Sequence, residues 1–288
     1  MTEGHVFDDP AVERLIATAV EEDLGRGDIT SEAVVAAGRR GLGVVQAKSA
    51  LVVAGTPLIA RVYERIATVE VTCRSAEGAA VQPGAVLAEV RGEARALLAG
   101  ERTVLNLLQH LSGIATLTRR CVQAIEGLDC AIRDTRKTLP GLRLLEKYAV
   151  HVGGGTNHRM RLDDGVLIKD NHVALAGGVE AAVAAAKRAL PGHEIEVECD
   201  TLAEVEEALG AGADVILFDN MTPAAIARAV RLVGERARME ASGGITPERI
   251  REIAALGVHY IAMGCLTHSA PAADVSIAIA PLEPERAR

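Results

Sequence analysis

The sequence predicts an α/β protein whose second half is a parallel sheet of repeated strand–helix units. Apolar, β-rich runs alternate there with amphipathic helical stretches, which is the pattern of βαβ units. The last strand ends are evenly spaced, with 21, 23 and 21 residues separating Glu198, Asp219, Ser242 and Met263. The stretch is much shorter than the about 250 residues of a complete barrel. We therefore expect an incomplete or decorated barrel. A doubly wound, dinucleotide-binding sheet is the weaker alternative, because no GxGxxG follows a first strand.

The composition is that of a globular chain with an aliphatic core. The 288 residues are 49% hydrophobic but only 2% aromatic, and Trp is absent. Ala, Val, Ile and Leu must therefore fill the core. A chain of this length can bury a sizeable core without disulfides or metals. The combination of low hydrophobicity and high charge that marks disordered chains is absent.

Net charge, hydropathy and cysteine usage argue against several classes of function. The net charge of −8 argues against broad nucleic-acid binding, which needs a basic surface. No apolar run approaches the about 18 residues of a membrane span, and Met1–Pro10 lacks the apolar stretch of a signal peptide. The five cysteines form no CxxC pair. We expect them to be reduced, in a cytoplasmic protein.

The first half is predicted to mix helices with short strands. A helix is expected over Asp9–Val20, then a polar loop over Glu22–Thr30 and a second helix over Pro57–Ile66. Short β-branched runs broken by Gly and Pro predict strands and hairpins within Gly41–Val53 and Val69–Val90.

A long amphipathic helix is predicted over Glu101–Ile125, where apolar residues recur at helical spacing. It joins the two halves of the chain. Later helices are expected at Val173–Leu190, Leu202–Ala211, Pro223–Glu235 and Pro247–Leu256.

The glycines of the first half suggest one alternative function. Gly78, Gly84 and Gly92 are spaced somewhat like those of lipoyl-carrier domains, which would make Lys48 the attachment lysine. Lys48 has no acidic hairpin tip around it, however. A small antiparallel sheet domain is the better interpretation, and a non-catalytic carrier module remains a weak hypothesis.

Charged residues and glycines recur where the strands of the second half end. In α/β barrels the catalytic residues lie at these ends. A purely structural face does not need both signs of charge at the same place in successive units. The ends are Asp134–Thr138, Lys169–His172, Glu198, Asp219–Asn220, Ser242–Gly244 and Met263–Gly264.

The last two strand ends favour phosphate binding. Glycine lets backbone N–H groups approach an anion, and a helix that begins just afterwards adds a favourable dipole. The loops after the final two strands of a barrel are a common phosphate site. Ordinary tight turns at Ser242–Gly244 and Met263–Gly264 are the alternative interpretation.

Positive charge is concentrated between residues 133 and 172. This segment holds eight Lys and Arg against five Asp and Glu, a local charge of 8 − 5 = +3. Arg136, Lys137 and Lys169 lie at predicted strand ends, where Arg and Lys suit carboxylate or phosphate groups. Arg143 and Lys147, four residues apart, are predicted to lie on a solvated helical face.

Glu198 and Asp219 supply the opposite charge. Carboxylates beside a phosphate site suit Mg²⁺ or sugar hydroxyls. A structural ion pair with a neighbouring lysine is an equally good interpretation at this level.

Several motifs together resemble the quinolinate phosphoribosyltransferase family. The resemblance implies an N-terminal α/β sandwich domain over residues 1–114, to which 272–288 return, and an incomplete α/β barrel over 115–271 that carries the site. It also implies a homodimer with shared active sites. The motifs are Glu101–Asn106, Asp134–Arg143, Leu145–Val150, Gly153–Arg159, Leu167–His172, Phe218–Met221, Glu240–Ile245 and Leu266–Ser269.

The same resemblance implies a reaction and a set of site residues. Quinolinate and phosphoribosyl pyrophosphate would give nicotinate mononucleotide, pyrophosphate and CO₂ with Mg²⁺, in de novo NAD biosynthesis. Lys137, Lys169, Glu198 and Asp219 would be catalytic, with Lys137 facing pyrophosphate or the reacting centre. Quinolinate would be bound by Thr135, Arg136, His158, Arg159 and Lys169. The ribose and Mg²⁺ would be contacted, directly or through water, by Glu198 and Asp219. The 5′-phosphate would be bound by Ser242, Gly243, Gly244, Met263 and Gly264, and Arg102 would reach into the neighbouring subunit's site.

One departure keeps alternatives open. Met160-Arg161-Leu162 stands where the family often has a residue followed by Gly-Leu, so Arg161 beside the carboxylate site could shift the choice of pyridine acid. A related phosphoribosyltransferase acting on another anionic ring is therefore an alternative. A barrel lyase with Lys169 as Schiff-base nucleophile is a weaker one, because the surrounding arginines would have no use.

Overall fold

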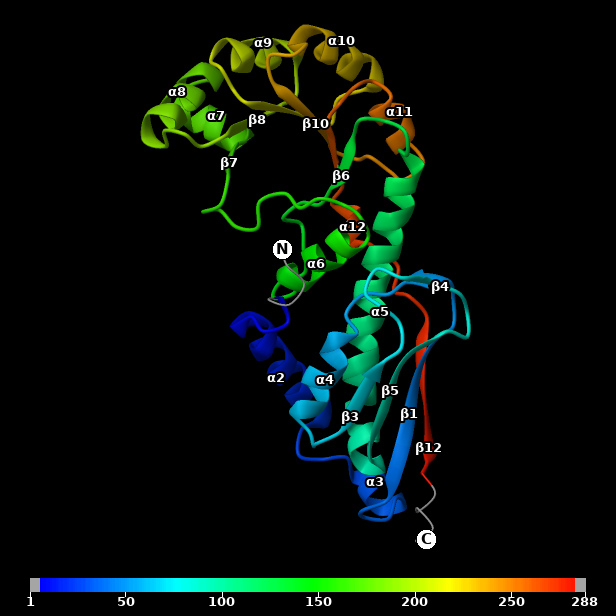
Figure 1. Ribbon diagram of the computed structural model, residues 1–288. Helices are drawn as coiled ribbons and strands as arrows, with labels where there is room; N and C mark the ends of the chain where they lie inside the picture. The colour runs from blue at the N-terminus through cyan, green and yellow to red at the C-terminus, as the bar shows by residue number, and fades with distance from the viewer. Residues whose placement is uncertain (1–5, 283–288) are drawn as a thin grey trace. The chain divides into compact units, whose positions relative to one another are not determined.

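The computed structural model describes residues 6–282 and divides the chain into two compact units (Figure 1). The first unit comprises the chain up to residue 119, the segment 139–154 and the chain from residue 270. The second unit comprises residues 120–138 and 155–269. Neither unit is continuous in sequence. Residues 283–288 of the segment expected to return to the first domain lie outside the described residues.

The first unit contains a four-stranded sheet in the order β12-β1-β5-β3. Its strands are β1 (Arg40–Ala47), β3 (Glu70–Cys73), β5 (Val86–Glu93) and β12 (Val275–Pro281). All neighbours pair antiparallel, and Gly41 to Ala47 of β1 face Pro281 to Val275 of β12. The last described strand therefore belongs to the sheet of the first unit. Strands β2 (Leu51–Val52) and β4 (Ala80–Val81) form a separate two-stranded ladder.

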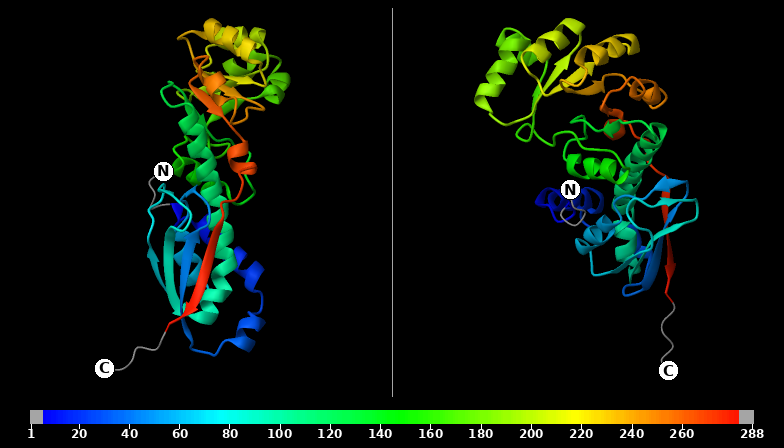
Figure 2. Two further views of the ribbon diagram at one scale, coloured as in Figure 1. Left: turned by 90° about the vertical axis from the view of Figure 1, so that its right-hand side faces the viewer. Right: turned by 45° about the horizontal axis from the view of Figure 1, so that its top comes forward.

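The helices of the first unit differ from the predictions mainly at their ends. They are α2 (Pro10–Leu24), α3 (Ile29–Val34), α4 (Pro57–Glu64), α5 (Ala94–Ala124) and α6 (Arg143–Val152). Part of the loop predicted over Glu22–Thr30 is helical. The Asp28 carboxylate accepts hydrogen bonds from the backbone N–H groups of Thr30 and Ser31 at 3.1 and 3.0 Å, and this N-cap starts α3. Figure 2 shows α5 running beside this sheet.

The solvated helical face predicted for Lys147 is wrong. Lys147 and the neighbouring Glu146 are 0% exposed, and Tyr148 is 1% exposed. The Glu146 carboxylate lies 2.8 Å from His110 Nε2 on α5, and the Tyr148 hydroxyl donates to Glu77 at 2.8 Å. A buried polar network therefore holds α6, and spacing along the sequence alone cannot distinguish such a face from a solvated one.

The second unit confirms the predicted parallel sheet. Six strands run in the order β6-β11-β10-β9-β8-β7, and every adjacent pair is parallel. The two end strands, β6 and β7, do not pair with each other among the described residues, so the barrel is incomplete. The strands are β6 (Ala131–Arg133), β7 (Val166–Ile168), β8 (Ile195–Cys199), β9 (Val215–Asp219), β10 (Arg238–Ser242) and β11 (Tyr260–Ala262).

Helices follow most strands of the second unit, and α8, α9 and α10 cover the outer face of the sheet in Figure 1. The single helix predicted over Val173–Leu190 is wrong. Gly177 and Gly178 have φ values of +87° and +136°, which only glycine adopts readily, and they separate two helices. The helices are α7 (Asp170–Ala176), α8 (Val179–Ala189), α9 (Leu202–Gly210), α10 (Pro223–Val233), α11 (Ile250–Ala254) and α12 (Cys265–His268).

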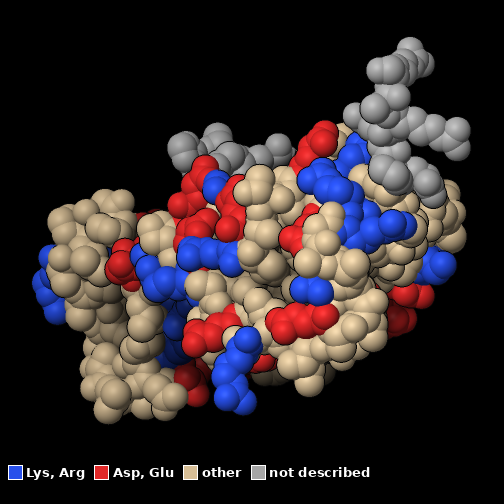
Figure 3. All heavy atoms as spheres, turned by 90° about the horizontal axis from the view of Figure 1, so that it is seen from below, with Lys and Arg blue, Asp and Glu red and all other residues tan. Residues whose placement is uncertain are grey.

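Helix hydropathy and surface charge both bear on the classes of function that were considered from the sequence. Among the described residues, no helix is long and apolar enough to cross a membrane. On the face drawn in Figure 3, Lys and Arg are interspersed with Asp and Glu and do not merge into one basic surface.

The close packing of α5 on α4 gives a stability prediction. A Cβ on Gly100 of α5 would lie 2.5 Å from Cε1 of the buried Tyr63 ring. We expect Gly100→Ala to lower the free energy of unfolding by about 1–3 kcal/mol, because the ring is fully buried and its hydroxyl is held by Leu97 O at 3.0 Å. Urea unfolding followed by circular dichroism measures this change.

The matched control is Gly210→Ala at the end of α9, where no heavy atom lies within 4 Å of the added Cβ. This substitution is expected to be neutral or stabilising by up to about 1 kcal/mol, because alanine favours the helix. Equal effects of the two substitutions would contradict the packing argument.

Candidate active site

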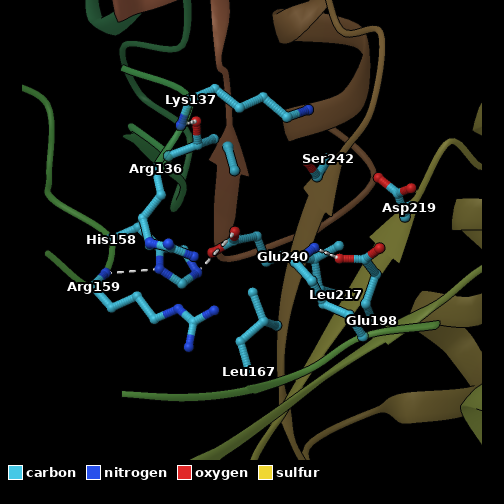
Figure 4. A pocket seen from close by; sticks show the side chains of 13 residues that line it. Arg136, Lys137, His158, Arg159, Leu167, Glu198, Leu217, Asp219, Glu240 and Ser242 are labelled. Atoms are coloured by element: carbon cyan, nitrogen blue, oxygen red, sulfur yellow. Dashed lines mark hydrogen bonds and ion pairs between the residues drawn. The ribbon is translucent and has the colours of Figure 1, made fainter. Parts of the chain in front are cut away.

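A cavity of about 300 Å³ opens at the carboxyl ends of the parallel strands and is lined by 13 residues of the second unit (Figure 4). Successive strands contribute side chains to it, because the carboxyl ends of parallel strands meet at one edge of a sheet. Arg136 and Arg159 lie on one side in Figure 4, and Glu198 and Asp219 on the other. The cavity contains nine residues singled out from the sequence: Thr135, Arg136, Lys137, His158, Arg159, Lys169, Glu198, Asp219 and Ser242.

Lys137 is held beside the turn that follows β11. Its backbone carbonyl accepts a hydrogen bond from Thr267 Oγ1 at 2.7 Å, and its backbone N–H donates to Thr135 Oγ1 at 3.0 Å. A Cβ on Gly264 would lie 3.0 Å from Lys137 Cδ. Glycine at this position therefore lets the lysine side chain pass close to the turn.

The loop that carries His158 and Arg159 is fixed by a buried carboxylate. Asp134 is 0% exposed, and it accepts hydrogen bonds from His158 N at 2.8 Å and from Asn157 Nδ2 at 2.6 Å. Thr156 N donates to Ile132 O at 2.8 Å, which ties the loop to β6. The loop thus continues the sheet edge where the barrel is incomplete.

Burial and charge both act on Arg159. Its Nη1 donates to Gly165 O at 2.9 Å. Burial, followed by repulsion from Arg136, lowers the pKa of Arg159, while Glu196 and Asp164 oppose this shift. The cations on this side of the cavity are close enough to repel one another, so carboxylates must offset their charge.

The carboxylates on the other side have polar partners. Lys169 Nζ forms an ion pair with Glu198 Oε2, and Asp219 Oδ2 accepts from Asn220 Nδ2 at 2.6 Å. The ion pair considered as an alternative from the sequence does form. It lies at the cavity surface, however, with the Lys169 side chain 41% exposed. The Glu198 side chain is only 13% exposed, but both members of the pair line the cavity.

The turn after β10 requires glycine. Gly243 has a φ of +89°, and a Cβ there would lie 2.6 Å from the backbone nitrogen of Asn220. Asn220 itself has a φ of +52°, and its N–H donates to Ser242 O at 3.0 Å. Ser242 lines the cavity, whereas Gly243, Gly244, Met263 and Gly264 are outside its lining.

Arg102 is an exposed residue of α5 in the first unit. It does not belong to the cavity lining of the described chain. Its predicted role in a neighbouring subunit's site stays a prediction.

Two buried glutamates were missed from the sequence. Glu240 lines the cavity and is 0% exposed, and its Oε2 accepts from Arg133 Nη1 at 2.6 Å. The Arg133 guanidinium stacks 3.7 Å from the centre of the Tyr260 ring. Glu196 lies on β8 of the same sheet and is 6% exposed. The available signal was their spacing, because each stands two residues before a site residue, Glu198 or Ser242, on the same face of its strand.

Burial, together with the nearby Glu196 carboxylate, raises the pKa of Glu240 to about 7, although His158 and Arg133 act in the opposite direction. His158, Glu196 and Glu240 bring their ligand atoms within 4.8 Å of one another. Arg133 pairs with Glu240, so a guanidinium neutralises part of the charge of this cluster.

Comparison with known proteins assigns both parts of the chain to one family. Residues 28–112 match the family described as quinolinate phosphoribosyl transferase, N-terminal domain. Residues 114–278 match the family described as quinolinate phosphoribosyl transferase, C-terminal domain. The first match includes Lys48, which therefore lies in this N-terminal domain and not in a recognised carrier domain.

Individual relatives are similar over most of their length. The carboxylating nicotinate-nucleotide pyrophosphorylase of Mycobacterium leprae is 44% identical over 269 residues, which cover 91% of this chain and 95% of that protein. The human protein of the same name is 42% identical over 237 residues, 80% of each chain. The crystal structure of NadC from Streptococcus pyogenes superposes with a TM-score of 0.89 at 39% identity, covering 94% of this chain and 97% of that one.

The raised pKa of Glu240 gives a pH prediction. The folded protein retains the Glu240 proton between the ordinary pKa of 4.5 and about 7, so this group's contribution to stability is complete below 4.5 and is lost as the pH rises through 7. We expect Glu240→Gln to remove that loss. Melting temperatures measured from pH 5 to pH 8 should therefore fall less in the variant than in the wild type.

Glu252→Gln is the control, because its side chain is 54% exposed. Its melting temperature should follow the wild-type pH profile. Parallel profiles for wild type and Glu240→Gln would contradict the assignment of the raised pKa.

Proposed function

The chain belongs to the quinolinate phosphoribosyltransferase family, and we propose that the cavity at the carboxyl ends of its parallel strands is the active site. The chain is accordingly a pentosyltransferase of NAD biosynthesis. It joins quinolinate to phosphoribosyl pyrophosphate and forms nicotinate mononucleotide, pyrophosphate and CO₂. The observation that carries the assignment of the site is the meeting of Arg136, Lys137, Arg159 and Lys169 with two carboxylates in one cavity.

Arg136, Arg159 and Lys169 bind the two quinolinate carboxylates, and His158 and Thr135 complete this part of the site. The support is chemical: a dianion needs several cations in a partly buried place, and arginine binds carboxylates bidentately. The mutual repulsion between Arg136 and Arg159 supports the assignment further, because a bound dianion would relieve it.

Lys137 and the two glycine-containing turns bind the phosphate groups. Lys137 lies beside Gly264, and Ser242 faces the cavity. Gly243, Gly244 and Gly264 have no side chain to obstruct a 5′-phosphate that approaches their backbone N–H groups. The Met263 N–H already donates to Arg133 O at 2.9 Å. Lys137 is then placed to neutralise charge that develops on the departing pyrophosphate.

Glu198 and Asp219 act at the ribose. When the bond to pyrophosphate breaks, positive charge develops on the ribose carbon, and nearby carboxylates stabilise it. Binding of quinolinate would draw Lys169 toward a substrate carboxylate and free Glu198 from its ion pair. The two carboxylates would then be available to the ribose hydroxyls.

The final decarboxylation needs little from the protein. Once the ring nitrogen carries ribose it is positively charged, so it can accept the electron pair left when the adjacent carboxylate departs as CO₂. The protein's contribution is to position the two substrates and neutralise their charges. No covalent bond to the enzyme is required. Lys169 forms an ion pair with Glu198, and an ammonium held in an ion pair is not a nucleophile, which disfavours a Schiff base at this residue.

Mg²⁺ accompanies phosphoribosyl pyrophosphate in this proposal. The donor set fits the ion, because Glu198 and Asp219 present carboxylate oxygens at the cavity surface and Mg²⁺ prefers oxygen ligands. The two carboxylates would hold it directly or through water. When bound, the ion supplies neutralisation of the pyrophosphate charge.

The assembly and the compartment are part of the same proposal. A homodimer in which Arg102 of each chain completes the partner's site would give an exposed cation on α5 a function. All five cysteines are free thiols, which supports a cytoplasmic location.

The reaction is tested by following CO₂ and nicotinate mononucleotide together, with quinolinate labelled at the 2-carboxylate, phosphoribosyl pyrophosphate and Mg²⁺. We expect equal amounts of the two products. Lys137→Ala and Lys169→Ala should each lower kcat/KM by about 10²-fold or more, because each removes a cation that stabilises charge in the transition state.

Lys187→Ala, at an exposed position of α8, is the matched control and should keep wild-type activity. Chelation of Mg²⁺ should stop both products. Binding of phosphoribosyl pyrophosphate without any product from quinolinate would leave the phosphate site intact and point to Arg161 and a different ring acid.

The shared site is tested by complementation. Arg102→Ala and Lys169→Ala chains, each inactive alone, are unfolded together and refolded as a mixture. About a quarter of wild-type activity should return, because half of the dimers are mixed and each mixed dimer has one intact site. No recovery in a mixture shown by light scattering to be dimeric would refute the role of Arg102.

A further inference from the structure

A second cavity of about 210 Å³ lies next to the active site, in the second unit where the barrel is incomplete. The two cavities share His158 and Arg159 as lining residues. Glu196 lines the second cavity and not the first. The His158–Arg159 segment therefore separates the substrate cavity from a buried carboxylate behind it.

We propose that Glu196 is a positioning residue for quinolinate: its buried carboxylate orients the His158 ring and so holds the His158–Arg159 segment in its substrate-binding geometry. The inference rests on the proposed role of this segment in binding the quinolinate carboxylates. Glu196 itself does not touch the substrate.

The first step of the argument concerns the proton on the His158 ring. The backbone N–H of Arg159 donates to His158 Nδ1 at 2.7 Å, as the dashed line in Figure 4 marks. A ring nitrogen that accepts a hydrogen bond carries no proton, so the ring proton is on Nε2. His158 Nε2 lies 3.0 Å from Glu196 Oε2. This close polar contact is not an aligned hydrogen bond, and it is through the contact that Glu196 acts on the ring.

The second step distinguishes Glu196 from Glu240. Glu240 Oε1 is 3.8 Å from His158 Nε2, and the Glu240 carboxylate is already engaged by Arg133 at 2.6 Å. Glu196 is closer to the ring by 0.8 Å, the difference between 3.8 and 3.0 Å. Glu196 is thus the carboxylate that fixes the ring, and Glu240 is held by the arginine.

The third step connects the ring to Arg159. Because His158 Nδ1 is the acceptor for Arg159 N, rotation of the ring would leave that N–H unsatisfied and release the backbone of Arg159. The Glu196 charge also attracts the Arg159 guanidinium, against the repulsion from Arg136. One buried carboxylate therefore supports two neighbouring residues of the site.

Two effects of Glu196 on a bound dianion have opposite signs. Its charge repels the substrate carboxylates, while its close contact with His158 Nε2 orders the residues that bind them. Glu196→Gln removes the charge but keeps an amide oxygen that can stay in contact with Nε2–H. Glu196→Leu removes both. If positioning is the function, Leu weakens quinolinate binding and Gln does not.

The experiment measures KM for each substrate separately. Glu196→Leu is expected to raise KM for quinolinate about tenfold or more, because the His158 ring loses its contact with a buried charged group, with KM for phosphoribosyl pyrophosphate within twofold. Glu196→Gln should stay within threefold of wild type for both substrates. A wild-type quinolinate KM in folded Glu196→Leu, or equal losses for Gln and Leu, would overturn the proposal.

Two parallel variants separate this inference from the proposed function. Glu194→Gln is the matched control, because Glu194 lines the same second cavity but forms its ion pair with Arg238; its KM values should be those of the wild type. Arg159→Ala tests the substrate-binding role of the segment. A raised quinolinate KM in Arg159→Ala with none in Glu196→Leu would refute only the positioning role, whereas no effect of Arg159→Ala would refute the proposed site.

A spectroscopic measurement covers the case in which Glu196→Leu does not fold. Imidazole ¹⁵N NMR of the wild-type protein, with His158 assigned by His158→Gln, should find His158 as the neutral Nε2–H tautomer. The Nε2 proton should persist in Glu196→Gln. An Nδ1–H tautomer in the wild type would overturn the proposal independently of any activity measurement.

Discussion

The active site depends on one electrostatic constraint: four cationic side chains must be held in a single cavity of about 300 Å³ before any anion arrives. Like charges at this density repel one another and resist burial. The chain meets the constraint with carboxylates. Asp134 fixes the loop backbone beside Arg159, and Glu196 attracts the Arg159 guanidinium. Glu198 at the cavity surface pairs with Lys169. The cations can therefore stay ordered in the absence of substrate.

This arrangement explains why the site is built on strand ends. Each parallel strand delivers one or two side chains to the same edge, and the residue two positions earlier points to the same face, deeper in the barrel. Glu196 and Glu198 on β8 illustrate the division: the deeper residue supports the site, and the outer one meets the substrate. A rigid sheet thus sets the spacing of charges, which is the main requirement when catalysis rests on positioning and charge neutralisation.

Much of the fold and of the site could be predicted because the relevant signals are local. The βαβ rhythm and the polar residues at strand ends are periodic features of the sequence, and nine of the residues singled out there do line one cavity. Predictions failed where a local pattern has two tertiary outcomes. Lys147 has the spacing of a solvated face but is buried, and Gly177–Gly178 divide a stretch whose apolar pattern looks continuous.

The sequence by itself determined the parallel sheet, the family and the residue types at the strand ends, because strand periodicity and motif spacing do not require knowledge of distant contacts. Only the tertiary structure decided which carboxylates support which cations. Glu196, Glu240 and Arg133 are separated by dozens of residues along the chain, and nothing local indicates that they meet His158. Their meeting follows from strand order and register, which place β6, β8 and β10 around one interior.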